Sequence, residues 1–271
     1  MKIAAVQLRS GVDIDANLRA AGILIRAAAN DGARFVATPE MTHLLQRSPK
    51  RLFAALRPEA KDKGVTFFSA LADELNIELL IGSLAILKGE RRAANRSFLF
   101  GTDGQILARY DKIHLFDVTV SRKETWMESA VYDRGALAVT AQIDGAALGL
   151  SICYDVRFAG LYRRYAEAGA QILTVPAAFT KPTGEAHWEA LLRARAIETG
   201  SFVIAPAQGG NHEDGRTTYG NSLIIGPWGE VIARVEGDQP GYILADIDIA
   251  DVASARKKIP AWQHNPDYTL S

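Results

Sequence analysis

The stretch Leu148-Gly-Leu-Ser-Ile-Cys-Tyr-Asp-Val-Arg157 contains the only cysteine of the chain, Cys153. Small and apolar residues at 146–152 predict a buried strand. The polar turn that follows leads toward a helical segment at 161–168. A side chain at such a strand-to-helix junction is held rigidly but stays reachable, which suits a nucleophile. A lone cysteine after an apolar strand is more often a buried hydrophobe, so the rest of the chain has to decide.

Length and charge narrow the class of protein. The chain has 271 residues, a formal net charge of zero and no long basic block, which argues against sequence-independent binding of nucleic acid. One cysteine cannot form an internal disulfide. No apolar stretch is long enough to cross a membrane, and the short apolar run at 3–8 predicts a first strand rather than a signal peptide. We therefore expect a soluble cytoplasmic protein that contacts neither nucleic acid nor membrane.

The alternation of elements predicts the fold class. Helices are expected at 14–29, 67–76, 161–168 and 185–199, and strands at 3–8, 34–37, 77–82, 95–100, 105–109, 137–143, 146–152, 172–175, 202–205, 222–225, 231–235 and 242–247. Hairpin turns at 101–104, 144–145 and 227–230 are mixed with the alternating helices and strands. This combination favours an α/β fold of mixed sheets with helices outside. No linker divides the chain, so we expect one domain, 1–271.

Three segments have little periodicity. Residues 42–64 predict loop and short helix, residues 111–135 a long functional loop, and residues 208–218 a Gly-rich polar loop. The polar tail from Asp251 is a candidate for contact with a partner.

Several residue types can assist a cysteine nucleophile. None of the five histidines lies in a pattern that marks it as a partner, and their spacing fits no zinc motif. Glu40 ends the short strand at 34–37, as Cys153 ends its own strand, and desolvation there would raise its pKa toward that of a working base. Lys112 follows the strand at 105–109, where an ammonium group can stabilise a developing oxyanion. Each residue considered alone is more often an ordinary surface group.

Three segments in order resemble the signatures of the nitrilase superfamily of carbon-nitrogen hydrolases. They are Thr-Pro-Glu40, Arg-Tyr-Asp-Lys-Ile-His-Leu-Phe-Asp117 and Ser-Ile-Cys-Tyr-Asp-Val-Arg-Phe158. Residues 187–198 and 219–229 extend the resemblance, which covers nearly the whole chain. It is most similar to the branch of omega-amidases and deaminated-glutathione amidases.

The resemblance implies an α-β-β-α sandwich and a Glu-Lys-Cys triad. Glu40 would be the general base, Lys112 would stabilise the tetrahedral intermediate, and Cys153 would be the nucleophile. The backbone N–H of Tyr154 would complete the oxyanion site, and Glu128 would be the second glutamate of the site. Such enzymes need no cofactor or metal and usually form homodimers or higher homo-oligomers.

The same branch implies a small-molecule amide substrate that carries a carboxylate and is cleaved through a thioester, with release of ammonia or an amine. Arg157 is the nearest cation for that carboxylate, although a structural role is equally expected. Phe179 and Thr180 would line the pocket. The alternatives are a nitrilase or N-carbamoyl amino-acid hydrolase with the same triad, a non-catalytic binding protein on the same fold, and a Cys-His hydrolase. The last ranks low because Cys153 lacks the flanking glycines of a nucleophile elbow.

Overall fold

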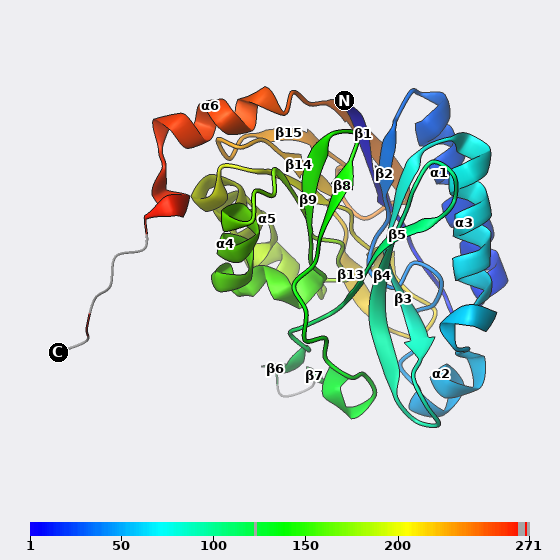
Figure 1. The fold of residues 1–271 in the computed structure, drawn as a ribbon. Coiled ribbons are helices and arrows are strands. Elements are labelled where there is room, and N and C mark those ends of the chain that lie inside the picture. The colour runs from blue at the N-terminus through cyan, green and yellow to red at the C-terminus, as the bar shows by residue number, and fades with distance from the viewer. Residues whose placement is uncertain (122–123, 265–268, 270–271) are drawn as a thin grey trace.

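The computed structural model describes residues 1–121, 124–264 and 269 of the chain. Two six-stranded sheets lie face to face, with helices on their outer sides (Figure 1). The first sheet contains β1 (Lys2–Gln7), β2 (Phe35–Ala37), β3 (Glu78–Leu87), β4 (Ala93–Phe100), β5 (Ile106–Asp111) and β16 (Gly241–Asp246). The second contains β8 (Thr140–Ile143), β9 (Ala146–Leu150), β10 (Ile172–Thr174), β11 (Phe202–Ala205), β14 (Leu223–Ile225) and β15 (Val231–Arg234).

Both sheets are mixed, as the sequence predicted. Their strand orders are β16-β1-β2-β3-β4-β5 and β15-β14-β11-β10-β9-β8. Strands β1, β2 and β3 run parallel, as do β9, β10 and β11, whereas the flanking strands pair antiparallel. Each sheet therefore has a parallel centre, and the carboxyl ends of its parallel strands share one edge, which is where open α/β sheets bind ligands.

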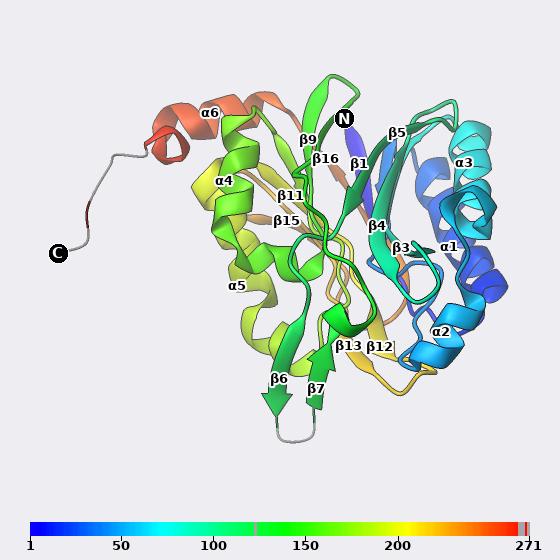
Figure 2. The same ribbon diagram turned by 60° about the horizontal axis from the view of Figure 1, so that its bottom comes forward.

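Helices cover the outer face of each sheet. The α-helices of the described residues are α1 (Ile14–Asn30), α2 (Pro49–Ala55), α3 (Lys63–Leu75), α4 (Ala159–Glu167), α5 (Lys181–Thr199) and α6 (Ala250–Lys258). Figure 2 shows α1 and α3 on one side of the two sheets and α4 and α5 on the other. Short 3₁₀ helices complete the chain: η1 (Glu59–Lys61), η2 (Glu128–Ala130), η3 (Cys153–Arg157) and η4 (Ala261–Gln263).

Alternation along the strands builds two apolar layers. In β1, Ile3 and Ala5 join the large cluster that includes the space between the sheets, whereas Ala4 and Val6 face α1 and α3. Successive side chains of a strand point to opposite faces, so one strand serves both layers. Because such strands are apolar on both faces, they form nearly continuous hydrophobic runs in the sequence.

Some element boundaries differ from the prediction. Helix α3 begins at Lys63, not at residue 67, because Asp62 accepts a hydrogen bond from the Val65 N–H and caps the helix. Helix α5 begins at Lys181, because a proline in the first turn does not interrupt a helix. Strand β3 continues through Gly82 with a shift of register instead of ending there.

Two segments predicted as loops contain hairpins. Strands β6 (Asp117–Ser121) and β7 (Glu124–Met127) pair within 111–135, and β12 (Gly209–Asn211) and β13 (Thr217–Tyr219) pair within 208–218. Their polar composition conceals the pairing. Within the tail from Asp251, α6 and η4 form, and residues 265–268 and 270–271 lie outside the described residues.

Candidate active site

The edge where the parallel strands end gathers three of the predicted side chains. Glu40 follows β2, Cys153 follows β9, and Lys112 follows the antiparallel strand β5. All three are buried, although they come from segments far apart in the sequence. The sheets therefore act as a frame that brings loop residues together.

The loop that carries Glu40 is fixed to β3 by main-chain contacts. The Thr38 N–H donates to the Leu80 carbonyl over 2.9 Å, and the Ser83 N–H donates to the Pro39 carbonyl over 3.2 Å. A Cβ at Gly82 would lie 2.1 Å from the Thr38 carbonyl oxygen. Glycine is required here because the two backbones approach too closely for any side chain.

The turn that carries Cys153 has an unusual backbone. Cys153 has a φ of +51°, a left-handed conformation that non-glycine residues rarely adopt. Its N–H donates to the Pro176 carbonyl over 2.8 Å, which ties the turn to the end of β10. Such strain in a buried, well-bonded turn is typical of functional sites.

Asp155 joins this turn to the segment around Lys112. Its buried carboxylate accepts hydrogen bonds from the Tyr110 hydroxyl at 2.7 Å, the His114 N–H at 3.0 Å and the Ile152 N–H at 2.9 Å. His114 Nδ1 lies 2.7 Å from the same group. Since Tyr110 and His114 flank Lys112, one carboxylate sets the position of the cysteine turn against the lysine.

A compact polar cluster forms around the lysine. Lys112 Nζ lies 2.8 Å from Glu40 Oε1 and 2.9 Å from Glu128 Oε2. Asn95 Nδ2, from β4, donates to Glu40 Oε1 over 2.8 Å and to Glu128 Oε1 over 3.0 Å. The Ala178 N–H donates to Glu40 Oε2 over 3.0 Å. The neighbouring Cys153 thiol acts to lower the pKa of the same carboxyl. Two carboxylates therefore share one ammonium group beside the thiol.

This arrangement sets the protonation states. Burial raises the pKa of the Cys153 thiol, and the charge of Glu40 raises it further against the opposing effect of Lys112, so the thiol keeps its proton at neutral pH. Burial alone would lower the pKa of Lys112, but the charges of Glu128 and Glu40 raise it well above its ordinary value. The free site thus holds the neutral Cys153 thiol beside the Lys112 ammonium group.

The expected direction of the Glu40 shift was wrong. Burial does act to raise the pKa of this carboxyl, but the charge of Lys112 and hydrogen bonds from Lys112, Cys153 and Asn95 together lower it. The sequence showed the buried strand end but not the cation that would pair with Glu40 there.

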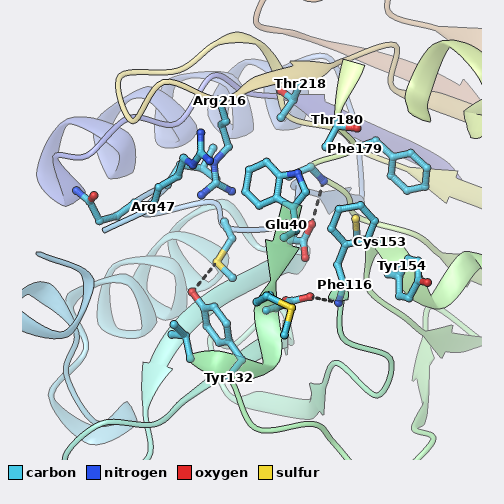
Figure 3. Close-up of a pocket in the computed structure, with 18 of the residues that line it drawn as sticks. Glu40, Arg47, Phe116, Tyr132, Cys153, Tyr154, Phe179, Thr180, Arg216 and Thr218 are labelled. Carbon is cyan, nitrogen blue, oxygen red and sulfur yellow. Dashed lines mark hydrogen bonds between the residues drawn. The ribbon is translucent and has the colours of Figure 1, made fainter. Parts of the chain in front are cut away.

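Glu40, Lys112 and Cys153 lie in the wall of a cavity of about 370 Å³ (Figure 3). Further lining residues are Met41, Leu44, Leu45, Leu52, Phe116, Trp126, Glu128, Val131, Tyr154, Phe179, Thr180, Arg47 and Arg216. Four more of the predicted residues, Glu128, Tyr154, Phe179 and Thr180, therefore reach the same space.

Arg157 does not join them. Its guanidinium carbon lies 5.8 Å from the centre of the Tyr154 ring and 5.3 Å from that of Phe179, and its nitrogens lie 3.4 Å from His187 Nδ1. Arg157 is absent from the cavity wall, whereas Arg47 and Arg216 are part of it.

The sequence reasoning missed four residues of the site. Asn95 could have been predicted, because a buried asparagine within the apolar strand β4 needs hydrogen-bond partners. Asp155 lay beside the cysteine, but nothing local showed that Tyr110 and His114 would reach it. Arg47 and Arg216 gave no signal, because surface arginines are common in loops.

The residues that the structure describes contain no group of three or more His, Cys, Asp or Glu side chains arranged to hold a metal ion. Within the same residues, no helix is both long and apolar enough to cross a membrane.

Comparison with known proteins agrees with this geometry. A deaminated glutathione amidase from Synechocystis sp. is 41% identical over 266 residues, which cover 96% of each chain. The omega-amidase NIT2 of Homo sapiens is 34% identical, with 97% of this chain and 94% of that protein covered. The amidase from Nesterenkonia sp. AN1, solved as a mutant with acrylamide added to its active site cysteine, superposes with a TM-score of 0.80 and 26% identity over 96% of this chain and 98% of that one.

The carbon-nitrogen hydrolase family model matches residues 2–257, which include every side chain of the polar cluster. The resemblance seen in the three sequence segments is thereby confirmed, as is the sandwich of two mixed sheets. The chain belongs to the carbon-nitrogen hydrolase family, and the relatives compared with it are amidases.

Proposed function

We propose that this chain hydrolyses the amide of a small, carboxylate-bearing substrate through a thioester on Cys153. The observation that carries the proposal is the burial of Cys153, Glu40 and Lys112 together in one cavity wall, where Lys112 and Asn95 hold the Glu40 carboxylate in its ionised form. A nucleophile, a base and a cation in the wall of one cavity are the parts that acyl transfer requires.

In the first half-reaction, Glu40 takes the thiol proton as the sulfur attacks the amide carbon. Lys112 and the Tyr154 main-chain N–H stabilise the oxyanion that forms. When the carbon–nitrogen bond breaks, the protonated Glu40 returns its proton to the leaving nitrogen, and ammonia or an amine departs. Cys153 is left as a thioester, and Glu40 is again a carboxylate.

In the second half-reaction, Glu40 takes a proton from water, and the hydroxide attacks the thioester carbon. The carbon–sulfur bond breaks, and the sulfur recovers the proton from Glu40. Glu128 holds Lys112 through both halves, since it accepts from Nζ at 2.9 Å and is itself fixed by the Phe116 N–H at 2.7 Å. Every step uses groups of this chain and one water.

The proposal is tested by measuring ammonia release from a panel of amides, ureido acids and nitriles. Amide turnover by the wild type, its loss in Cys153→Ala and an acyl adduct on Cys153 by mass spectrometry are the expected results. Full turnover by Cys153→Ala would refute the mechanism. Preferential turnover of nitriles or ureido acids would favour the alternative hydrolases, and no turnover or thiol reactivity would favour a binding protein.

We also propose that the chain acts in the cytoplasm as a homodimer or higher homo-oligomer. The exposed side chains of Ile197 on α5 and Trp228 in the β14–β15 turn support the assembly. Helix α5 lies on the side opposite to α1 and α3, and Ile197 lies against Gly229, the neighbour of Trp228. Adjacent exposed apolar side chains of this kind are expected at contacts between subunits. Light scattering of the purified protein measures its mass directly.

A further inference from the structure

We propose that Arg47 and Arg216 form a carboxylate-binding subsite at the end of the cavity away from Cys153. The inference rests on the proposed amidase function and names what holds the charged end of the substrate. Figure 3 shows both arginines on one side of the cavity, and Cys153, Tyr154 and Phe179 on the other. Both guanidinium groups lie over the same ring, that of Trp126, at 4.9 Å and 5.2 Å from its centre.

The two arginines come from loops that the fold brings together. Arg47 lies in the segment between Glu40 and α2, and Arg216 lies in the turn of the β12–β13 hairpin. Asp214, with its side chain almost fully buried, accepts from the Arg216 N–H at 3.1 Å and from Nε at 2.8 Å. This bond holds the guanidinium in place but uses only its Nε, so the Nη groups can still bind a carboxylate.

Charge balance points to an anion as the occupant. Asp214 neutralises one of the two guanidinium groups. Arg47 is exposed and forms no ion pair within the described part of the chain, so one positive charge remains at this end. Placing two like charges over one ring has an electrostatic cost, which a bound carboxylate would offset.

The opposite end of the cavity repels the same group. There Glu40 and Glu128 share the single charge of Lys112, which leaves an excess of one negative charge beside Cys153. The wall of the cavity also includes the apolar side chains of Leu44, Leu52 and Val131. The cavity therefore orients a substrate that has a neutral amide at one end, a short apolar chain, and a carboxylate at the other.

The test compares two amides of equal chain length. Glutaramate carries a carboxylate at the far end from its amide, and pentanamide carries none. The wild type should favour glutaramate in kcat/KM, chiefly through a lower KM, and this preference should weaken as salt is raised. In Arg47→Gln the preference should fall by about tenfold, the size expected for one charge-assisted contact. Arg47→Lys should restore part of it.

Two arginines serve as controls. Arg51→Gln removes an exposed charge of α2 that is not part of the cavity wall, and Arg157→Gln removes the cation first considered for this role. Both should keep the preference for glutaramate. Equal use of the two amides by the wild type, an unchanged preference in Arg47→Gln, or its collapse in Arg157→Gln would each overturn the subsite.

A binding measurement separates this proposal from the proposed function. In Cys153→Ala, calorimetry should show tighter binding of glutaramate than of pentanamide, and adding Arg47→Gln should remove the difference. If the wild type hydrolyses neither amide but the difference in binding is present, the subsite stands and the reaction is wrong. If glutaramate and pentanamide bind with equal affinity, the subsite is wrong, whichever substrate the enzyme hydrolyses.

Discussion

Within the described residues, Asn95 is the one neutral side chain that donates to both Glu40 and Glu128. Its Nδ2 donates to Glu40 and to Glu128, and its backbone carbonyl accepts from the Lys112 N–H at 3.0 Å. It thus contacts three members of the cluster without adding charge. We regard it as a positioning residue, because it acts through Glu40 and Lys112.

Replacing Asn95 with alanine should lower kcat/KM about tenfold to a hundredfold, since hydrogen bonds to charged groups contribute about 1.5–3 kcal/mol each. The pKa of Glu40 should also rise, because one of the bonds that lowers it is lost. The acid limb of the kcat/KM profile should therefore move to higher pH. A loss of rate with no movement of that limb would show a merely structural role.

The pH profile of the wild type follows from the same cluster. In the proposed mechanism Glu40 must be ionised to accept the thiol proton. Its pKa is lowered, so the acid limb of kcat/KM should lie below the ordinary carboxyl value of about 4.3. The pKa values of Cys153 and Lys112 are raised, so activity should persist into alkaline solution. An acid limb near pH 7, measured in short assays on folded protein, would contradict this assignment.

At the scale of elements, Gly82 decides how closely the Glu40 loop approaches β3. Gly82→Ala would place a Cβ 2.1 Å from the Thr38 carbonyl oxygen and 2.4 Å from Pro176 Cβ, and backbone atoms cannot yield easily. We expect a loss of about 1–3 kcal/mol in the free energy of unfolding and a marked loss of activity, because Glu40 moves.

Urea denaturation and ammonia release measure the two effects of Gly82→Ala. Gly89 in the β3–β4 turn is the matched control, since a Cβ there would meet nothing within 4 Å. Gly89→Ala should leave stability and activity close to those of the wild type. Equal stability and activity of the two variants would show that the close approach of the Glu40 loop to Gly82 has no effect.

Asp155 couples two elements, η3 and the end of β5. An asparagine at this position keeps the volume but loses the charge and replaces one acceptor with a donor, which would face hydroxyl and N–H groups. Asp155→Asn should lower the free energy of unfolding by about 3 kcal/mol, and Tyr110→Phe, which removes one contact of several, by about 1 kcal/mol. Urea denaturation measures both variants. If Asp155→Asn and Tyr110→Phe lose similar free energies of unfolding, the other hydrogen bonds to Asp155 contribute nothing to stability.

The elements also show what the sequence can predict. Hydrophobic periodicity located most strands and the two longest helices, α1 and α5. Burial of one face imposes a repeat of two residues on a strand and of 3.6 residues on a helix. The hairpins β6–β7 and β12–β13 escaped because they are short and polar, and their pairing depends on contacts with the rest of the fold. Residues 34–40 show the same limit, since the strand was predicted but the contact of Glu40 with Lys112 joins residues 72 positions apart.

At the scale of the whole molecule, large apolar side chains are exposed on the α5 side, which is the side opposite to α1 and α3. Ile197 and Trp228 are both more than half exposed, and Arg193 of α5 donates to the Gly229 carbonyl over 2.8 Å, which holds the Trp228 turn against the helix. Lys258 of α6 lies 5.4 Å from the Trp228 ring. These contacts join α5, the β14–β15 turn and α6, and the proposed homo-oligomer would bury Ile197 and Trp228 on this side.

Light scattering should give a mass that is a multiple of the 29.4 kDa chain, and Ile197→Glu should shift the protein toward the monomer, because an isologous contact places the new charge twice at one interface. Ile23 of α1 is the matched control, since it is 68% exposed but lies on the opposite side of the sheets. Ile23→Glu should keep the wild-type mass. A monomeric wild type, or equal dissociation of both variants, would rule out an interface on the α5 side.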